Sequence, residues 1–512
     1  MTDFQIKIES RQRRFDLLSQ HSKFDAVILG GGINGACVYD YFCRRGFRVL
    51  LLDKGDFASG TSQASAMMVW GGLLYLRNLD FSTVFKLCRE RDRMIKEMPS
   101  RVNVQFLRYL PSGLKGRKKS FIHMALWFYW LLGLMRREPP RSESLFDEMT
   151  LLRDNFIRGS LLYEEAVLTE SDARFVLRWI TPHQNSGNSA FNYCHAQGEY
   201  NGHDRYWHLD INDRFTGKTY STQSRLIINC TGVWADEVNR QHKIQSPVCH
   251  ALSKGVFLII KRSRLHKSLL VFDLGEYGDA ITLIPWGPVS LWGPTETSVD
   301  NIEEGFEVTA QDTTYLWDHY HKRFSKSLSK QDVISFRCGI RPLVVPVGYH
   351  SDRYPLDLSR RQKIVVDREK PWISCYGGKV TGCQAMAQKV VRAASHWLPE
   401  PITQPALHQI TPVWSSFPGI EEAIPAAAFC RDYEFCYTLD DYLRRRTNIS
   451  QWVSHEGLGF NHENMPILKK IAAEINGGDL PSAEREVTAY AEAVDARRQK
   501  ALSDISERRP PA

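Results

Sequence analysis

The stretch FDAVILGGGINGACVYDYFCRRGFRVLLLDKGD, Phe24 to Asp56, places a cluster of glycines between two apolar runs and ends on acidic residues. Phe24–Gly30 predicts a buried parallel strand, Ile33–Arg45 a helix that ends before Gly46, and Phe47–Leu52 a second strand. These elements make a strand–helix–strand unit of about 30 residues. The stretch therefore predicts the start of an α/β domain.

The glycines have the spacing G-x-G-x-x-G, at Gly30, Gly32 and Gly35. The first allows the tight turn, the second lets the backbone approach a pyrophosphate, and the third lets the helix pack on the strand. The phosphates then lie at the positive end of the helix. Asp53, at the end of the second strand, is placed to accept hydrogen bonds from a ribose. Together these residues predict a dinucleotide site.

Two later segments repeat the pattern of a strand, a turn of small residues and a helix: Arg225–Val238 and Pro371–Leu398. Because the three segments lie far apart in the chain, we expect a discontinuous Rossmann-like domain. Lys254–Thr297 contains short apolar runs separated by Gly-Pro turns, which predicts antiparallel strands of a second, β-rich domain. After residue 405 the pattern becomes helical.

The residues after Asp53 favour FAD over NAD as the dinucleotide. Gly60–Leu76 supplies small hydroxyl residues and a Gly-Gly pair, along which an extended cofactor can run. Gly377-Gly378-Lys379 precedes a helix whose N-terminus would stabilise negative charge on a reduced flavin. The predicted cofactor-binding residues are Gly30, Gly32, Ile33, Asn34, Gly35, Asp53, Lys54, Thr61, Ser62, Ser65, Gly71, Gly72, Thr231, Gly232, Trp234, Gly339, Arg341, Gly377, Gly378, Lys379, Val380 and Thr381.

The predicted fold is therefore α/β, with a discontinuous FAD-binding domain, a β-rich substrate domain and a C-terminal helical domain. The expected division is a lead-in at 1–23, FAD-binding segments at 24–110, 166–250 and 337–400, an insert at 111–165, the substrate domain at 251–336 and the helical domain at 401–512.

Composition limits the class of protein. The 512 residues have a net charge of +8, which favours anionic partners, but no nucleic-acid-binding motif is present. The eleven cysteines never form Cys-x-x-Cys, so neither a disulfide framework nor a structural zinc site is expected, and a reducing cytoplasm fits best. Cys194, His195, His203 and His208 lie close in sequence but resemble alternating strands, and we predict no metal site.

Lys115–Arg137 is an aromatic stretch flanked by basic clusters. Its apolar part, Phe121–Met135, is shorter than the roughly 20 residues that a membrane-spanning helix needs. Two interpretations remain: a helix lying in the membrane interface, with peripheral attachment to the inner face, or a buried core helix with solvated ends.

The chain resembles the FAD-dependent glycerol-3-phosphate dehydrogenases, which belong to the D-amino-acid-oxidase-like flavoproteins. The motifs that carry the resemblance are GGGINGA, GTSQASAMMVWGGLLYL, SDARFVL, INCTGVWADEV, IPWGPVSLWGPTET, CGIRPL, SCYGGKVTG and LDDYLRRRT, in family order from about residue 24 to residue 450. The resemblance implies a noncovalent FAD that accepts a hydride from a substrate carbon, with quinone as the final acceptor. It also implies that Arg341, Arg360, Lys379 and Tyr75 contact a phosphorylated substrate.

Three positions depart from the family pattern. Trp70 replaces a histidine, Leu74 an arginine and Phe257 a second histidine. The site has therefore lost a cation and a candidate base, and the aromatic replacements predict a larger or more apolar substrate group. We expect a substrate other than glycerol 3-phosphate itself and leave the proton acceptor unassigned.

Two alternatives to a quinone-linked dehydrogenase stay open. The first is an oxidase that uses O₂ and acts on an amine, a hydroxy acid or a phosphonate. The second is a protein that binds FAD without catalysis and docks to a partner or a membrane through residues 115–137.

Overall fold

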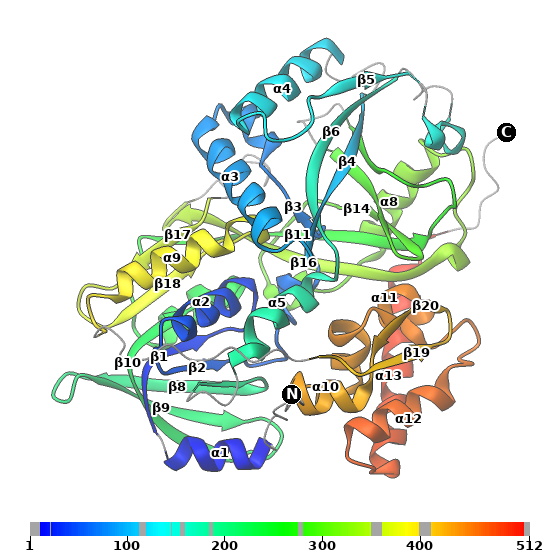
Figure 1. Ribbon diagram of the computed structural model, residues 1–512. Helices are drawn as coiled ribbons and strands as arrows, with labels where there is room; N and C mark the ends of the chain where they lie inside the picture. The colour runs from blue at the N-terminus through cyan, green and yellow to red at the C-terminus, as the bar shows by residue number, and fades with distance from the viewer. Residues whose placement is uncertain are drawn as a thin grey trace, which may run out of the picture.

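Two β-sheets organise the chain (Figure 1). The computed structural model describes residues 11–20, 22–111, 119–144, 146–153, 159–183, 188–274, 280–349, 361–398 and 411–505. Within this part of the chain, no helix is both long and apolar enough to cross a membrane.

The first sheet has the strand order β17-β18-β10-β1-β2-β7, and β8 and β9 extend it from β10. Its strands are β1 (Lys23–Leu29), β2 (Val49–Leu52), β7 (Ser189–Phe191), β8 (Cys194–Asn201), β9 (Tyr206–Asp213), β10 (Thr219–Asn229), β17 (Lys363–Val366) and β18 (Trp372–Tyr376). β1, β2, β10 and β18 run parallel. The prediction that three distant segments share one sheet is confirmed.

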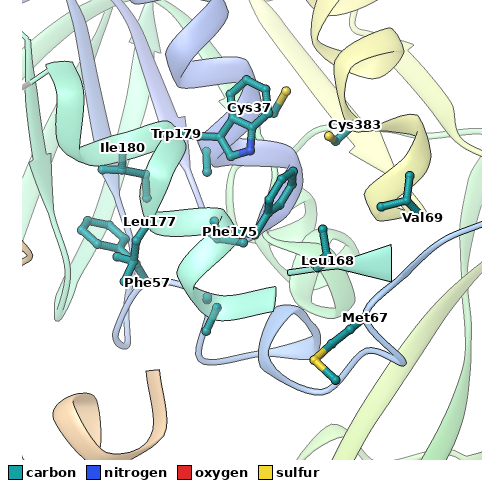
Figure 2. Close-up of a cluster of buried hydrophobic side chains, with 14 of the residues drawn as sticks. Cys37, Phe57, Met67, Val69, Leu168, Phe175, Leu177, Trp179, Ile180 and Cys383 are labelled. Carbon is teal, nitrogen blue, oxygen red and sulfur yellow. The ribbon is translucent and has the colours of Figure 1, made fainter. Parts of the chain in front are cut away.

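Both faces of this sheet are covered, which explains its uninterrupted apolar strands. Ala26 and Ile28 of β1 pack in the core formed with α2 (Ile33–Arg44), α5 (Asp172–Ile180) and α9 (Cys383–Ala394). Val27 and Leu29 pack in a second core with α1 (Arg11–Gln20), β8 and β9. Figure 2 shows Phe175 of α5 beside α2, in the first of these cores.

The second sheet has the order β15-β11-β14-β13-β12-β4-β6-β3, with β16 beside β11 and β5 beside β6. Its strands are β3 (Met68–Val69), β4 (Val102–Leu110), β5 (Arg141–Glu143), β6 (Ser160–Leu168), β11 (Val248–Lys261), β12 (Leu269–Asp273), β13 (Ala280–Trp286), β14 (Val289–Gly293), β15 (Thr297–Val299) and β16 (Val333–Pro346). The antiparallel strands expected in Lys254–Thr297 are confirmed.

The chain passes from one sheet to the other several times. Strands from one predicted domain segment therefore lie in different sheets. β4, β6 and most of β16 lie in the second sheet, although the sequence groups much of them with the FAD-binding segments. Helices α3 (Phe81–Glu97) and α4 (Lys119–Leu132) follow the second sheet's first strands, and α7 (Ile302–Gly305) and α8 (Ala310–His321) follow β15. The predicted domain boundaries therefore stay a prediction.

The C-terminal region contains α10 (Ala427–Tyr433), α11 (Ile449–Trp452), α12 (Met465–Ile475) and α13 (Leu480–Ala501), as the helical pattern indicates. A hairpin of β19 (Trp414–Phe417) and β20 (Ile420–Pro425) was not expected. Between α10 and α11, Asp441–Arg446 forms a π-helical turn.

This turn is tied to the first sheet by buried charges. Arg445 Nε and Arg446 Nη1 each lie 2.5 Å from Asp56 Oδ2, and Arg446 Nη2 donates to Oδ1 at 2.8 Å. Burial by itself would raise the pKa of Asp56, but the two guanidinium groups outweigh it and lower that pKa. Asp56 lies three residues after Asp53, so the C-terminal region fixes the loop that follows the predicted ribose acid.

We expect Asp56→Asn to lower the free energy of unfolding by about 3–5 kcal/mol, because it removes the carboxylate that pairs with the buried Arg446 and one of those that pair with Arg445. The contribution of Asp56 is complete above the ordinary aspartate pKa and is lost as pH falls through the lowered one. Urea unfolding at neutral pH measures the difference. Glu484→Gln, which breaks the exposed pair with Lys469, is the control and should change stability little. Equal effects of the two variants would contradict the assignment.

Candidate cofactor and substrate site

The turn between β1 and α2 requires glycine at two positions. Gly30 has φ +96°, and a Cβ there would lie 2.6 Å from the Cys230 carbonyl oxygen. A Cβ at Gly35 would lie 1.8 Å from the Gly30 carbonyl oxygen. The first contact brings the ends of β1 and β10 together, and the second sets α2 directly on the turn. Both agree with the roles expected of the fingerprint glycines.

The N-terminus of α2 opens onto a cavity of about 500 Å³. Gly32 is the N-cap and contributes no side-chain cap, so the first-turn amides have the arrangement that binds phosphate. Ser62 lies beside them, and its Oγ accepts a hydrogen bond of 3.0 Å from the Ile33 amide. Thr61 donates to the Ile340 carbonyl at 2.6 Å, which fixes this loop against β16.

Asp53 lies at the end of β2, as predicted. Its carboxylate accepts hydrogen bonds from the amides of Gly31, at 2.6 Å, and Gly55, at 2.9 Å. Burial raises the pKa of Asp53 to about 6 despite these donors. Ribose hydroxyls that donated hydrogen bonds to this carboxylate would stabilise its charged form and lower its pKa. The Nζ of Lys54 lies 4.2 Å from the centroid of the Trp234 ring, and both residues line the cavity.

Most of the predicted cofactor-binding residues line this one cavity. They are Gly30, Gly32, Ile33, Asn34, Asp53, Lys54, Thr61, Ser62, Ser65, Thr231, Gly232, Trp234, Gly377, Gly378, Lys379 and Val380. Gly35, Gly71, Gly72, Gly339 and Thr381 lie outside its wall, Arg341 lines a second cavity, and Arg360 lies outside the described residues.

Another part of the cavity wall is built from the turn between β18 and α9. Asn34 Nδ2 donates to the Gly377 carbonyl at 2.8 Å, so α2 and this turn are joined directly. Asn34 Oδ1 is buried and has no hydrogen-bond partner among the described residues. Gly378 has φ +147°, and a Cβ there would lie 2.6 Å from Asn34 Nδ2. A cavity whose wall contains phosphate-binding amides and an unsatisfied buried polar atom fits FAD.

Several wall residues were not predicted. His195 comes from β8, Glu237 and Gln241 from α6 (Ala235–Gln241), and Asp172 from α5. Asp172 Oδ2 accepts from the Ser65 amide at 2.8 Å and pairs with Arg337 at 2.5 Å, so it holds the Ser65 loop in place. Asp172 belongs to the SDARFVL motif, which is the only sequence signal for it. No local pattern marks His195, Glu237 or Gln241.

A second cavity of about 790 Å³ lies between the second sheet, α4 and the 3₁₀ helix η2 (Leu73–Asn78). Arg341 and Pro342 are neighbours in β16, and they line the second and the first cavity respectively. Successive residues of a strand point to opposite faces, so β16 forms a wall shared by both cavities. Arg341 Nη1 lies 3.0 Å from Glu296, a residue that the sequence did not single out.

Lys379 lines the first cavity, and Tyr75, which lines neither cavity, lies beside it. The Lys379 Nζ lies 4.0 Å from the centroid of the Tyr75 ring, and that ring lies 6.0 Å from Trp70, which lines the second cavity. Burial lowers the pKa of Lys379 to about 7. The Tyr75 hydroxyl is buried and has no hydrogen-bond partner among the described residues.

The two other departures from the family pattern lie in different surroundings. Leu74 lines the second cavity and is 41% exposed. Phe257 is buried in β11, inside the main hydrophobic core, and lines neither cavity. Only the Leu74 and Trp70 changes therefore alter the wall of the second cavity.

FAD affinity should rise with pH up to about 6 and level off above it. Protonation blocks the acceptor atoms of Asp53, whereas ribose hydroxyls would favour its charged form. Asp53→Asn should remove this dependence and weaken binding by about 10- to 100-fold. Quenching of FAD fluorescence on titration into apoprotein, between pH 5 and 8, measures both effects. Asp25→Asn, near the start of β1, is the control and should keep the pH dependence. If the affinity for FAD does not change between pH 5 and 8, Asp53 does not have this role.

Comparison with known proteins gives a consistent assignment. A family model described as FAD dependent oxidoreductase (DAO) matches residues 25–357. The chain is 28% identical over 385 residues to the aerobic glycerol-3-phosphate dehydrogenase of Staphylococcus aureus (strain MRSA252), covering 73% of this chain and 68% of that protein.

Two solved structures share the fold. Glycerol-3-phosphate dehydrogenase from Bacillus halodurans complexed with FAD has a TM-score of 0.67 at 20% identity, over 98% of this chain and 99% of that one. L-alpha-glycerophosphate oxidase from Mycoplasma pneumoniae with FAD bound has a TM-score of 0.57 at 15% identity, over 73% and 95%. Since the family model covers well over half of the sequence, the chain belongs to the DAO family of FAD-dependent oxidoreductases.

Proposed function

We propose that the protein oxidises a C–OH group of an anionic substrate similar to glycerol 3-phosphate, held in the second cavity. The observation that carries this proposal is the shared wall: Arg341 and Pro342 line the substrate and cofactor cavities from adjacent positions of one strand. FAD, when bound, supplies the acceptor for the hydride. The residues that line the first cavity are proposed to bind it.

Within this proposal, Lys379 is the proton acceptor that the sequence left unassigned. Its pKa is lowered by burial to about 7, so the neutral amine is available near neutral pH. It lies beside Tyr75, whose ring is 6.0 Å from that of Trp70 in the wall of the second cavity. Arg341 and Tyr75 are proposed to contact the substrate head group, and the position of Arg360 in the sequence still suggests a contribution to anion binding.

The electron acceptor is proposed to be a quinone or O₂. The named relatives include both a dehydrogenase and an oxidase, so we keep both acceptors in the proposal. The exposed helix α4 favours quinone, because it offers an apolar surface beside the substrate cavity.

α4 exposes one apolar face and buries the other. Ile122, Leu126 and Tyr129 are buried, and Tyr129 donates a hydrogen bond to the buried Glu165. The exposed large side chains of α4 and of the turn after it are Phe121, Met124, Trp127, Phe128, Leu131, Leu134 and Met135, each at least 40% exposed. The helix is therefore not enclosed as a core helix, and we propose that this face contacts a membrane surface peripherally.

Lys379→Met should slow anaerobic flavin reduction by about 10²- to 10⁴-fold, because the proton acceptor is lost. In the unaltered protein, the rate at low substrate concentration should rise through pH 7 and then level off. Stopped-flow bleaching of the flavin by glycerol 3-phosphate and related alcohols measures both. Lys389→Met, on the exposed side of helix α9, which begins four residues after Lys379, is the control. If Lys379→Met reduces the flavin at the unaltered rate, Lys379 is not the acceptor.

Flotation with anionic liposomes tests the membrane contact. Trp127→Ser combined with Leu131→Ser should reduce the bound fraction severalfold, since each removes apolar surface that would enter the headgroup region. Phe460→Ser, an equally exposed aromatic in the C-terminal region, should leave binding unchanged. Binding that is insensitive to the α4 substitutions would disprove the contact.

A further inference from the structure

We infer that the substrate is an amphiphile: a polar head group that carries the reacting C–OH lies at Arg341, and a hydrocarbon chain fills the second cavity. This inference rests on the proposed function and names the class of substrate that the site takes. The evidence is the size of the second cavity, the chemistry of its wall, the state of its arginine and its position beneath α4.

The size of the cavity exceeds what a compact head group requires. At about 790 Å³, it falls in the range that accommodates drug-sized ligands. A molecule as small as glycerol 3-phosphate would leave most of this volume to water beside apolar side chains, which is unfavourable.

The wall of the cavity is mainly apolar. Leucines 73, 74 and 76 of η2 contribute to it, and its other large apolar groups are Met68, Trp70, Leu79, Phe81, Leu107, Phe121, Ile122, Met124, Leu126, Phe128, Val271 and Leu274. Each methylene placed against such a wall gains binding free energy because it leaves water. The wall therefore matches a hydrocarbon chain.

Besides Arg77, the cavity wall contains Arg341, whose charge is partly neutralised. Arg341 pairs with Glu296 at 3.0 Å, and Ser253 donates to the same carboxylate at 2.5 Å. Glu296 thus offsets the charge of the arginine where a dianionic head group would need uncompensated cations. Lys379 nearby has a pKa lowered by burial to about 7, so it adds only part of a charge at neutral pH. Burial of a chain would compensate for this weak anchoring of the head group.

The cavity also lies where an amphiphile would enter. Phe121, Met124 and Phe128 line it and are 51%, 63% and 40% exposed, so the same side chains belong to the cavity wall and to the outer apolar face of α4. A chain can therefore pass from an apolar surface to Arg341 with continuous apolar contact.

Binding of alkyl phosphates to the FAD-loaded protein tests the ligand class without any turnover. Decyl phosphate has no oxidisable secondary alcohol, and we expect it to bind at least about 100-fold more tightly than ethyl phosphate in isothermal titration calorimetry. Ala125→Trp places an indole in the cavity wall and should remove at least about tenfold of that difference. Leu131→Trp, on the same helix but outside the cavity, should bind like the unaltered protein.

Two results would overturn the inference. One is that ethyl phosphate and decyl phosphate bind the unaltered protein with equal affinity. This measurement does not depend on the folding of any variant. The other is that decylubiquinone binds tightly, that Ala125→Trp weakens this binding, and that decyl phosphate does not bind. That result would assign the cavity to the electron acceptor. Flavin absorbance and the melting temperature verify that each variant is folded and loaded.

Flavin bleaching separates this inference from the proposed function. Ethers of glycerol 3-phosphate that carry a methyl, butyl or octyl group on the terminal oxygen should bleach the flavin, and the half-saturating concentration should fall by about two- to fourfold per methylene. Bleaching without dependence on chain length overturns the amphiphile and leaves the proposed function standing. Binding of alkyl phosphates without bleaching by any of the alcohols overturns the proposed function and leaves the ligand class standing.

Discussion

The close approach of three strand ends determines the cofactor cavity. The Cys230 carbonyl at the end of β10 occupies the space that a side chain at Gly30 would need, and Asn34 at the start of α2 donates to the Gly377 carbonyl after β18. Parallel strands of one sheet end at the same edge, so these contacts bring together segments that lie about 200 and 350 residues apart in the chain. The cavity exists only when all three ends are in register.

Local chemistry made the first part of this site predictable. The apolar run of β1, the fingerprint glycines and Asp53 lie within one short stretch, and each has a conformational or hydrogen-bonding role that depends on near neighbours in sequence. The same reasoning found β10 with α6, and β18 with α9, because each is a strand followed by a turn of small residues. Sequence patterns of this kind carry information on the scale of one supersecondary unit.

The remaining features depend on pairings that no local pattern encodes. Glu296 offsets the charge of Arg341 only because β11 pairs with both β15 and β16, which brings residues 296 and 341 together. The wall position of His195 depends on β8 extending the first sheet, and the β19–β20 hairpin has no counterpart in the helical pattern around it. The substitutions at positions 70 and 74 were visible beforehand, but the cavity that they line was not.

The charges of the site are arranged so that few are both buried and uncompensated. Asp56 has two arginines, Asp172 has Arg337, and Arg341 has Glu296. Lys379 differs from these groups. Its ammonium lies over the ring of Tyr75, and burial lowers its pKa to about 7. Proton transfer at neutral pH requires a group that can gain or lose a proton near pH 7 while its charged neighbours keep their charge.

The π-helical turn at Asp441–Arg446 has a consequence for biosynthesis. Arg446 reaches Asp56 across 390 positions of sequence, so the loop that follows Asp53 lacks this anchor until the C-terminal region has been translated. Until then Asp56 has neither of its two arginine partners, although Asn192 donates to the same carboxylate. The loop beside the first cavity therefore reaches its charge-paired form only after the C-terminal region has been made.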